Sequence, residues 1–252
     1  MIIGGLAAFA MTQMGIGWKI KFGTIAIPAA VYLVMCLMRT YPKTERVAAN
    51  LSFGDMIKGT MKPLFFLLFC LMWLTASVEL GPDQWFPTLM KELTGVEGIL
   101  FLVYTSGIMF IIRYFFSGFV HRFSPFLVLL ICSVVTGLGL FWLGSLQTGA
   151  PVVAAFAAAT IFGIGKSCIW PTMLGVISER FPQGGALAMN LVGGAGMLAI
   201  SVALPIMGST FDDFGAGAAL KSVSGLTIVL IVIFAALHIS FQRKGGYKAE
   251  KI

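Results

Sequence analysis

Long apolar runs separated by short polar stretches dominate the chain. The pattern predicts eight membrane spans, the first beginning at the N-terminus and the others covering about 23–38, 63–89, 96–120, 125–146, 150–178, 184–207 and 220–241. Several runs reach the roughly 20 residues that a helix needs to cross a hydrocarbon core of about 30 Å. They lack the alternating polarity of membrane β-strands. The pattern therefore predicts an all-α integral membrane protein with about eight transmembrane helices.

Composition and charge agree with this class. Charged residues make up 11% of the chain and hydrophobic residues 58%. Because a soluble domain carries about 25% charged residues, we expect the lipid bilayer as a partner. The net charge of +7 comes from basic residues that orient membrane helices, so no nucleic-acid partner is expected. The four cysteines lie in apolar spans without metal-type spacing and are expected to be buried hydrophobes.

Residues 39–62 form the longest polar stretch and carry more basic than acidic residues. Positively charged loops stay in the cytoplasm, which makes this stretch a cytoplasmic linker containing a short amphipathic helix that lies on the membrane. Counting spans outward from it places both chain ends in the cytoplasm and the turns at 91–92, 145–149 and 211–217 on the far side. The predicted location is the bacterial inner (plasma) membrane.

The third span carries an acidic face. Thr75, Glu79 and Asp83 follow one another at i, i+4 spacing and therefore share one side of a helix. Pro82 and Pro87 predict an irregular segment between them, with Asp83 at the membrane interface. A carboxyl group at membrane depth can bind a proton, because burial disfavours its charged form. Glu79 is thus a proton-coupling or substrate-binding residue, a structural acid paired with a neighbouring helix, or an acid already wetted at the interface.

The sixth span contains a lysine among apolar residues. A cation near the bilayer centre costs at least about 2.5–3.5 kcal/mol, so Lys166 is expected to face protein or a water-filled cavity. We expect it to bind substrate or to balance the charge of Glu79 across that cavity. Trp170 shares its face at i+4, beside Pro171, and offers an apolar plate on which a sugar ring stacks. Packing against a neighbouring helix is the alternative for Trp170.

Other polar residues are expected at the cytoplasmic side or in the seventh span. Arg113 either clamps an anion or, as favoured here, locks the cytoplasmic ends of the helices together. Glu179 and Arg180 are expected to form a state-dependent ion pair where the sixth span ends. Asn190 offers a donor and an acceptor to a cavity or to a neighbouring helix. Close helix approach is expected at nearby glycines: Gly193, Gly194 and Gly196.

Catalytic chemistry has no recognisable set of residues in this sequence. The two histidines are far apart, and neither accompanies a candidate Ser or Cys nucleophile. The glycine-rich runs follow no strand, which excludes the dinucleotide-binding interpretation. The sequence therefore predicts no enzyme, no metal site and no cofactor.

Several segments resemble the major facilitator superfamily of transporters. GIGWKIKFGTIAIPAAVYLVMCLMRTYPKTE is similar to the link between the fifth and sixth helices, and SVELGPDQWFPTLM to the seventh helix of bacterial sugar-type members. RYFFSGFVHRFSP is a loose copy of the G-x-x-x-D-R-x-G-R loop that lacks its acidic residue, and it places Arg122 in a gating position. GKSCIWPTMLGVISERFPQGGA resembles the tenth helix and its following loop. Fucose-permease-like sugar symporters are the nearest members.

This resemblance implies twelve helices in two six-helix halves that work by alternating access. Residues 1–38 would be the last two helices of the N-terminal half, 39–62 the cytoplasmic linker and 63–252 the complete C-terminal bundle. The four missing N-terminal helices would complete the transport unit, and the chain is expected to be a fragment or the product of a late start codon.

The expected function is secondary active transport of a small polar solute, with a sugar as the first choice. Glu79 would be the protonatable site, and the cavity would be lined by Thr75, Lys166, Trp170 and Asn190. The energy source would be the proton gradient, without a cofactor. Two alternatives stay open: transport of an anion such as nitrate or an organic acid, and a non-transporting membrane sensor or subunit built on the same helices.

Overall fold

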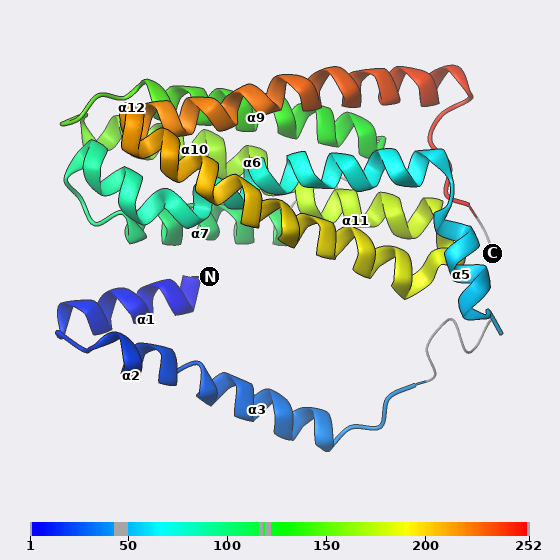
Figure 1. The fold of residues 1–252 in the computed structure, drawn as a ribbon, viewed down its shortest axis with the longest axis horizontal. Helices are drawn as coiled ribbons and strands as arrows, with labels where there is room; N and C mark the ends of the chain where they lie inside the picture. Colours follow the sequence, from blue (N-terminus) through cyan, green and yellow to red (C-terminus); the bar gives the residue numbers. More distant parts are fainter. Residues whose placement is uncertain (1, 43–49, 116–117, 119–121, 251–252) are drawn as a thin grey trace.

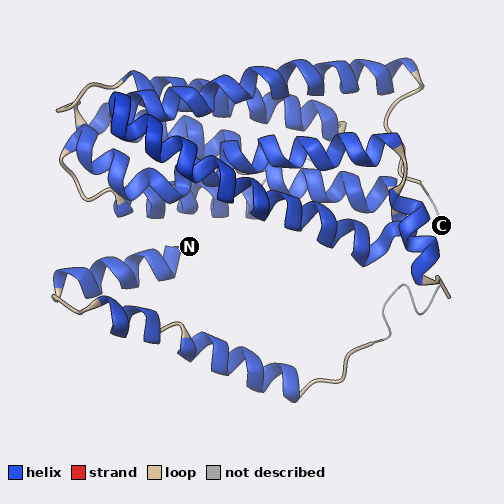
Figure 2. Cartoon of the chain, in the orientation of Figure 1, coloured by secondary structure: helices blue, strands red, loops and turns tan. Residues whose placement is uncertain are grey.

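The structure is a computed structural model that describes residues 2–42, 50–115, 118 and 122–250, and all regular secondary structure in these ranges is helical (Figure 2). Five helical stretches in the described part are long and apolar enough to cross a membrane, as expected of an all-α membrane protein. The helices are α1 (Ile2–Gln13), α2 (Trp18–Gly23), α3 (Ala26–Leu37), α5 (Phe53–Thr60), α6 (Pro63–Thr94), α7 (Ile99–Phe115), α9 (Pro125–Ser145), α10 (Val152–Lys166), α11 (Ile169–Arg180), a 3₁₀ turn η1 (Pro182–Gly184) and α12 (Gly185–Arg243).

From α6 onward, successive spans run in opposite directions along one axis, with α10 and α11 forming a single span and the two arms of α12 forming two (Figure 1). One end of the bundle, here named the basic end, holds α5, the starts of α6 and α9, the ends of α11 and α12, and the chain's C-terminus. The turns after α6 and α9 lie at the opposite end. This alternation is the one that the apolar runs predict. The count of eight spans stays a prediction, because α1 and α7 have only 12 and 17 described residues.

The irregular segment expected between Pro82 and Pro87 is not present, and this prediction was wrong. Both prolines lie inside α6, which is a continuous helix of 32 residues. A proline removes the donor to the carbonyl four residues earlier, and membrane helices tolerate this where neighbouring helices cover the freed group. Val78, whose carbonyl faces Pro82 in this way, is fully buried. The continuity of α6 keeps Asp83 inside the bundle.

The span predicted at 150–178 is divided into α10 and α11 by a break at Ser167 and Cys168. Cys168 has φ −107° and ψ −1° and forms the N-cap of α11. The Ser167 N–H donates to the Ile164 carbonyl, a tightened last turn of α10. The break therefore leaves backbone groups of both half-helices inside a membrane span, directly after Lys166.

The spans predicted at 184–207 and 220–241 are joined into α12 by a reversal at one residue. Gly215 has φ 83° and ψ 175°, a combination that is essentially restricted to glycine. The two arms of α12 run back along each other from this point (Figure 1). The first arm packs against α6 through Met207, which contacts Gly81, and the second packs against α9 through Thr227, which contacts Gly137.

The N-terminal helices make few contacts with the rest of the chain. α1 touches α7, where a Cβ added to Gly5 would lie 2.6 Å from Val103. α2 and α3 contain no buried residue, and Figure 1 shows them apart from the bundle of α6–α12. The division of the chain into 1–38, 39–62 and 63–252 stays a prediction, and part of the linker, 43–49, lies outside the described residues.

Within the linker, the expected short helix is α5. It begins with a capping box in which the Asp55 N–H donates to Ser52 Oγ (3.2 Å) and the Ser52 N–H donates to Asp55 Oδ2 (3.1 Å). Met56 and Gly59 are buried, and a Cβ on Gly59 would lie 3.0 Å from the Gly184 nitrogen. α5 thus rests on the turn that connects α11 to α12.

The C-terminal tail, residues 244–250, folds back over the basic end and ties three elements together. Glu250 forms ion pairs with Lys62 (2.9 Å) and Arg180 (3.0 Å). Its N–H donates to the Glu179 carbonyl (2.8 Å), and Arg180 donates to the Lys248 carbonyl (2.8 Å). The ion pair expected between Glu179 and Arg180 is therefore replaced in this structure by one between Arg180 and the tail.

Close approach of helices depends on small residues at particular positions. A Cβ on Gly165 would lie 2.8 Å from the Thr136 Cα, so α9 and α10 touch backbone to backbone. A Cβ on Gly196 would lie 2.7 Å from the Trp170 ring, so the glycine leaves room for that ring. Nothing lies within 4 Å of a Cβ on Gly193 or Gly194, so only Gly196 of the three predicted glycines serves close packing.

Gly165→Ala is expected to lower the free energy of unfolding by about 1–3 kcal/mol, because the methyl group forces α10 away from α9. The change is measured as a loss of thermal stability of the purified protein in detergent micelles. Gly193→Ala is the matched control, since its Cβ meets open space and alanine favours a helix by about 1 kcal/mol. Equal effects of the two variants would contradict the close contact between α9 and α10.

The tail is expected to detach in acid. Lys62, followed by Arg180, holds the pKa of the Glu250 carboxyl below its usual range. Docking of the tail is therefore favoured above the ordinary glutamate value of about 4.3 and is lost as the pH falls through the lowered value. The Tyr247 ring lies 5.8 Å from the rings of Phe126 and Phe241.

The ring-current shift of Tyr247, followed by NMR with labelled tyrosine, is thus expected to vanish on acidification. In Glu250→Gln the undocked shift should appear at every pH, while Tyr104, which shares a hydrogen bond with Thr160 (2.7 Å), stays unchanged. A docked tail in Glu250→Gln would show that the ion pairs do not hold it.

Candidate functional site

Two ion pairs among the described residues lie beside the break between α10 and α11, and three of their four side chains are buried. Lys166 pairs with Asp83, and these side chains are 0% and 2% exposed. Glu79, 4% exposed, faces the 41% exposed Arg113, with 3.5 Å between its Oε1 and the Arg113 Nη2. Four charged groups from α6, α7 and α10 therefore meet inside the helix bundle.

Lys166 has an enclosed environment. Its Nζ lies 4.9 Å from the centre of the Phe162 ring and 3.5 Å from Thr105 Oγ1, in addition to its contact with Asp83. An ammonium placed over an aromatic face is attracted by the ring quadrupole, more strongly when water is excluded. The predicted burial of Lys166 is confirmed.

The predicted partner of Lys166 was wrong. The sequence placed Glu79 opposite it and Asp83 at the interface, whereas Asp83 is buried and holds the lysine. The two acids are one helical turn apart on the same face of α6, as the i, i+4 spacing predicts. Because α6 runs straight through Pro82, that face continues into the core and brings Asp83 to Lys166.

The break supplies polar backbone groups, and side chains satisfy them. Arg113 Nε donates to the Ser167 carbonyl (2.7 Å), and Ser167 Oγ donates to the Gly163 carbonyl. Lys166, as the last residue of α10, places its positive charge where the helix dipole favours a cation. Interrupted helices of this kind form ion and substrate sites in membrane transporters.

Each carboxylate has one oxygen without a partner. Glu79 Oε2 and Asp83 Oδ2 are buried and accept no hydrogen bond from the described residues. An unsatisfied buried polar group costs about 1–3 kcal/mol, and more when it is charged. A proton bound to either carboxyl would remove that charge. The site can therefore hold and release a proton at membrane depth.

Arg113 joins three helices. From α7 it points to Glu79 of α6 and donates to the break between α10 and α11. Its side chain is 41% exposed, unlike the other three members of the cluster. It also borders a pocket that Glu79 does not border. The choice between locking the helices and clamping an anion stays a prediction.

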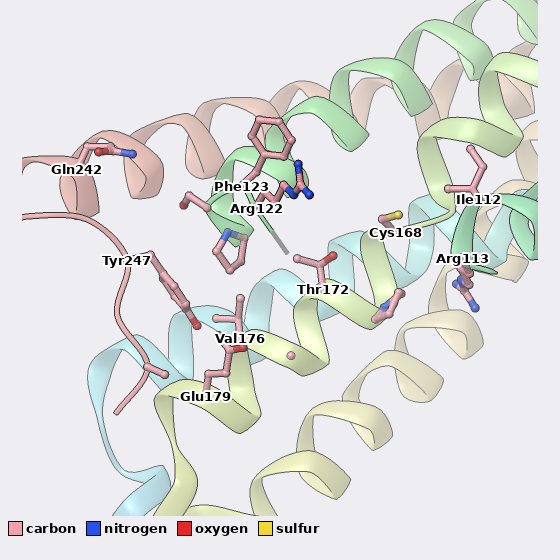
Figure 3. A pocket seen from close by; sticks show the side chains of 15 residues that line it. Ile112, Arg113, Arg122, Phe123, Cys168, Thr172, Val176, Glu179, Gln242 and Tyr247 are labelled. Atoms are coloured by element: carbon pink, nitrogen blue, oxygen red, sulfur yellow. The ribbon is translucent and has the colours of Figure 1, made fainter. Parts of the chain in front are cut away.

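This pocket, the basic-end pocket, has a volume of about 700 Å³ (Figure 3). Arg113 and Cys168 lie at one end, and Glu179 and Tyr247 at the other. Its lining is Ile112, Arg113, Arg122, Phe123, Ser124, Pro125, Cys168, Pro171, Thr172, Gly175, Val176, Glu179, Gln242, Tyr247 and Ala249. Arg122 and Glu179, predicted as gating residues, are thus brought to the same space as Arg113.

The remaining predicted residues lie elsewhere. The Trp170 ring packs on Gly196, as in the packing alternative, and does not border the basic-end pocket. Thr75 is buried and donates to the Met72 carbonyl of its own helix (3.1 Å). Asn190 is exposed on α12. These three residues have no contact here that suggests a ligand.

The sequence analysis missed two parts of the site, the Ser167 carbonyl and the pairing of Asp83 with Lys166. The Ser167 carbonyl matters because of the helix break, and its signal in the sequence is Pro171, which lacks the N–H that would bond the carbonyl four residues earlier. The pairing of Asp83 could have been predicted from its spacing, because Asp83 lies one turn after Glu79 on the same face of α6. The four cysteines are free, but the expectation that they are buried was wrong, because Cys70 is exposed and the other three are only partly buried. In the described part of the chain, no group of three or more His, Cys, Asp or Glu side chains could hold a metal ion.

Comparisons with protein families, curated proteins and solved structures gave no match. The resemblance to the major facilitator superfamily therefore remains a prediction from the quoted segments. The geometry of the site is therefore the basis for its chemistry. What is established is an all-α chain with membrane-length helices and a buried, charged helix break.

Lys166→Met is expected to lower the free energy of unfolding by about 3–5 kcal/mol, because it leaves Asp83 as an uncompensated buried charge. Adding Asp83→Asn should recover part of that loss, and the double-mutant cycle isolates the coupling. The measurement is denaturant-induced unfolding in micelles.

The exposed ion pair between Lys91 and Glu97 is the control, since its side chains are 60% and 44% exposed. Lys91→Met should change stability by no more than about 1 kcal/mol. Similar losses for both lysine variants, or purely additive effects at Lys166 and Asp83, would refute the buried pair.

Proposed function

We propose that this protein is a secondary active transporter of a small polar solute, driven by the proton gradient and working by alternating access. The observation that carries the proposal is the Glu79–Arg113 pair beside a helix break, where one carboxylate oxygen is buried without a partner. Ionisable groups inside membrane spans are costly and generally mark substrate, ion or proton pathways.

Glu79 is the proposed proton site. Its charged form is stabilised most by Arg113, through a contact that is long at 3.5 Å, and less by the charge of Lys166 and by the Trp170 backbone. The Lys166–Asp83 pair is closer and fully enclosed, which suits a structural role. Protonation of Glu79 would release Arg113, and this change beside the break gives a physical link between a proton and the arrangement of α10 and α11.

The transporter is proposed to be of the major facilitator type, in the bacterial inner membrane. Supporting this are the quoted segments and the antiparallel run of α6–α12 (Figure 1). The basic end is proposed as cytoplasmic, because basic residues concentrate at cytoplasmic ends. Residues 1–38 would belong to the N-terminal half, and the exposed apolar surfaces of α2 and α3 are consistent with further helices packing there.

The choice between a sugar and an anion now favours the anion. The sugar hypothesis relied on Trp170 as a stacking surface, and that ring lies against Gly196. The anion hypothesis relied on Arg113 and Lys166, and Arg113 borders a pocket of about 700 Å³. A non-transporting sensor on the same helices would bind a ligand without moving it.

The full-length protein, with the four N-terminal helices that the resemblance implies, should accumulate a solute from a panel of labelled sugars and organic anions in proteoliposomes with an imposed proton gradient. Glu79→Gln should abolish gradient-driven accumulation, because the amide cannot bind and release a proton. Glu92→Gln, an exposed acid near the end of the same helix, is the matched control and should retain uptake. Uptake that survives Glu79→Gln would remove Glu79 from the mechanism, and binding without accumulation would favour the sensor.

A further inference from the structure

We propose that Arg113 is shared between Glu79 and the anionic group of a small organic anion in the basic-end pocket, so that the anion and one proton bind together. The biological role of this coupling rests on the proposed transport function. The coupling itself is a property of binding and can be measured without transport. Glu79 is the proton acceptor, and the pocket is the ligand site.

The position of Arg113 makes sharing possible. Its Nε is fixed on the Ser167 carbonyl at 2.7 Å, whereas its Nη2 lies 3.5 Å from Glu79. Charge-assisted hydrogen bonds normally measure about 2.7–2.9 Å, so the bond to Glu79 is a loose one. A guanidinium carries five N–H donors in a rigid plane, and Arg113 is 41% exposed and lines the pocket. The N–H groups that bond neither Ser167 nor Glu79 can therefore take a ligand while the Nε stays on the break, and the negative charge of that ligand competes with Glu79 for the one cation.

Glu79 responds because it cannot reach water or the ligand itself. It is 4% exposed and does not border the pocket. If a ligand takes the guanidinium, Glu79 is left as a buried charge without its partner, which is strongly unfavourable unless the carboxyl takes up a proton. Proton binding to Glu79 and anion binding to Arg113 thus favour each other. By linkage, each must strengthen the other by the same factor, typically about 5–150-fold.

The pocket has the chemistry of an organic-anion site. Its volume lies within the roughly 300–1,000 Å³ range of small-molecule sites. Arg113 and Arg122 supply positive charge, Thr172 supplies a hydroxyl, and Ile112 and Val176 supply apolar surface. The planar guanidinium fork matches carboxylate, sulfonate and phosphate groups. Glu179 at the far end disfavours a second negative charge, so the pocket fits one anionic head on an apolar body.

The other buried pair cannot perform the same exchange. Lys166 and Asp83 are at most 2% exposed, and neither borders the pocket. A ligand in the pocket therefore meets only the Arg113 side of the cluster. This asymmetry assigns the coupled proton to Glu79 rather than to Asp83.

Benzenesulfonate is a suitable probe, because it stays ionised across the working pH range. It is titrated into the purified full chain in detergent, in weakly buffered solution with a pH indicator. We expect one proton to be taken up for each probe bound, and the affinity to fall by up to about tenfold for each unit rise in pH while Glu79 is ionised in the free protein. Benzenesulfonamide, the neutral isostere, should neither bind nor move protons.

Variants separate the coupling from simple charge attraction. Glu79→Gln should bind the probe with an affinity independent of pH and without proton uptake. Glu179→Gln removes the acid that borders the same pocket without touching Arg113, and it should keep the coupled proton. Arg113→Gln should weaken binding at least tenfold. Size-exclusion profiles check that each variant is folded, and the proton uptake of the unmodified chain tests the proposal independently of any variant.

Absence of probe binding, or proton uptake that persists in Glu79→Gln, would overturn the sharing of Arg113. Proton uptake induced by phosphatidylglycerol nanodiscs, with displacement of the probe, would assign the site to a lipid head group and overturn the soluble ligand. The outcome is separable from the transport test. Coupled binding without accumulation would contradict only the transport proposal. Accumulation without coupled binding would contradict only the sharing of Arg113.

Discussion

The burial of the Lys166 ammonium is the constraint on which the bundle depends. A lysine with no exposed surface has no water to solvate it, so a carboxylate has to meet it inside the protein. Asp83 does so, and this contact fixes α6 against α10. The break that follows Lys166 frees the Ser167 carbonyl, to which Arg113 donates while it also faces Glu79. The two ion pairs therefore meet on either side of one break.

The cluster is electrically balanced with two acids and two bases. In a medium of low dielectric constant, the net charge of the cluster matters more than the strength of any one ion pair. Adding a proton alone would leave an excess positive charge near Arg113, and adding an anion alone would leave an excess negative one. Adding both keeps the balance. Electroneutrality thus gives the enclosed Lys166–Asp83 pair a role beyond anchoring, since it compensates itself and leaves Glu79 and Arg113 to respond to what binds.

Periodicity and hydropathy were sufficient for the helical class, the alternating direction of the spans and the shared face of Glu79 and Asp83. They failed where a tertiary contact overrode a local rule. Pro82 reads as a helix breaker, yet packing around α6 preserves the helix. The break at Ser167 lies in an apolar run that hydropathy reads as one span, although Pro171 lacks the N–H that would bond the Ser167 carbonyl, and a side chain from α7 supplies the donor instead. The identity of the acid that meets Lys166 depends on the continuity of α6 and on the break after Lys166, so sequence spacing alone predicted the wrong acid.

The reversal at Gly215 determines which face of the last span packs against α9. The two arms of α12 meet at one residue, with no loop to absorb a change in length. Each residue of an α-helix advances the chain by about 100° around its axis, so a single insertion or deletion would turn Thr227 away from Gly137 of α9. The length of this turn is thus constrained as tightly as the core. Gln147 and Thr148, by contrast, are exposed in the turn between α9 and α10 and can accept an inserted epitope, whereas the Gly149 and Ala150 N–H groups that follow them donate to the Leu93 carbonyl and hold the turn on α6.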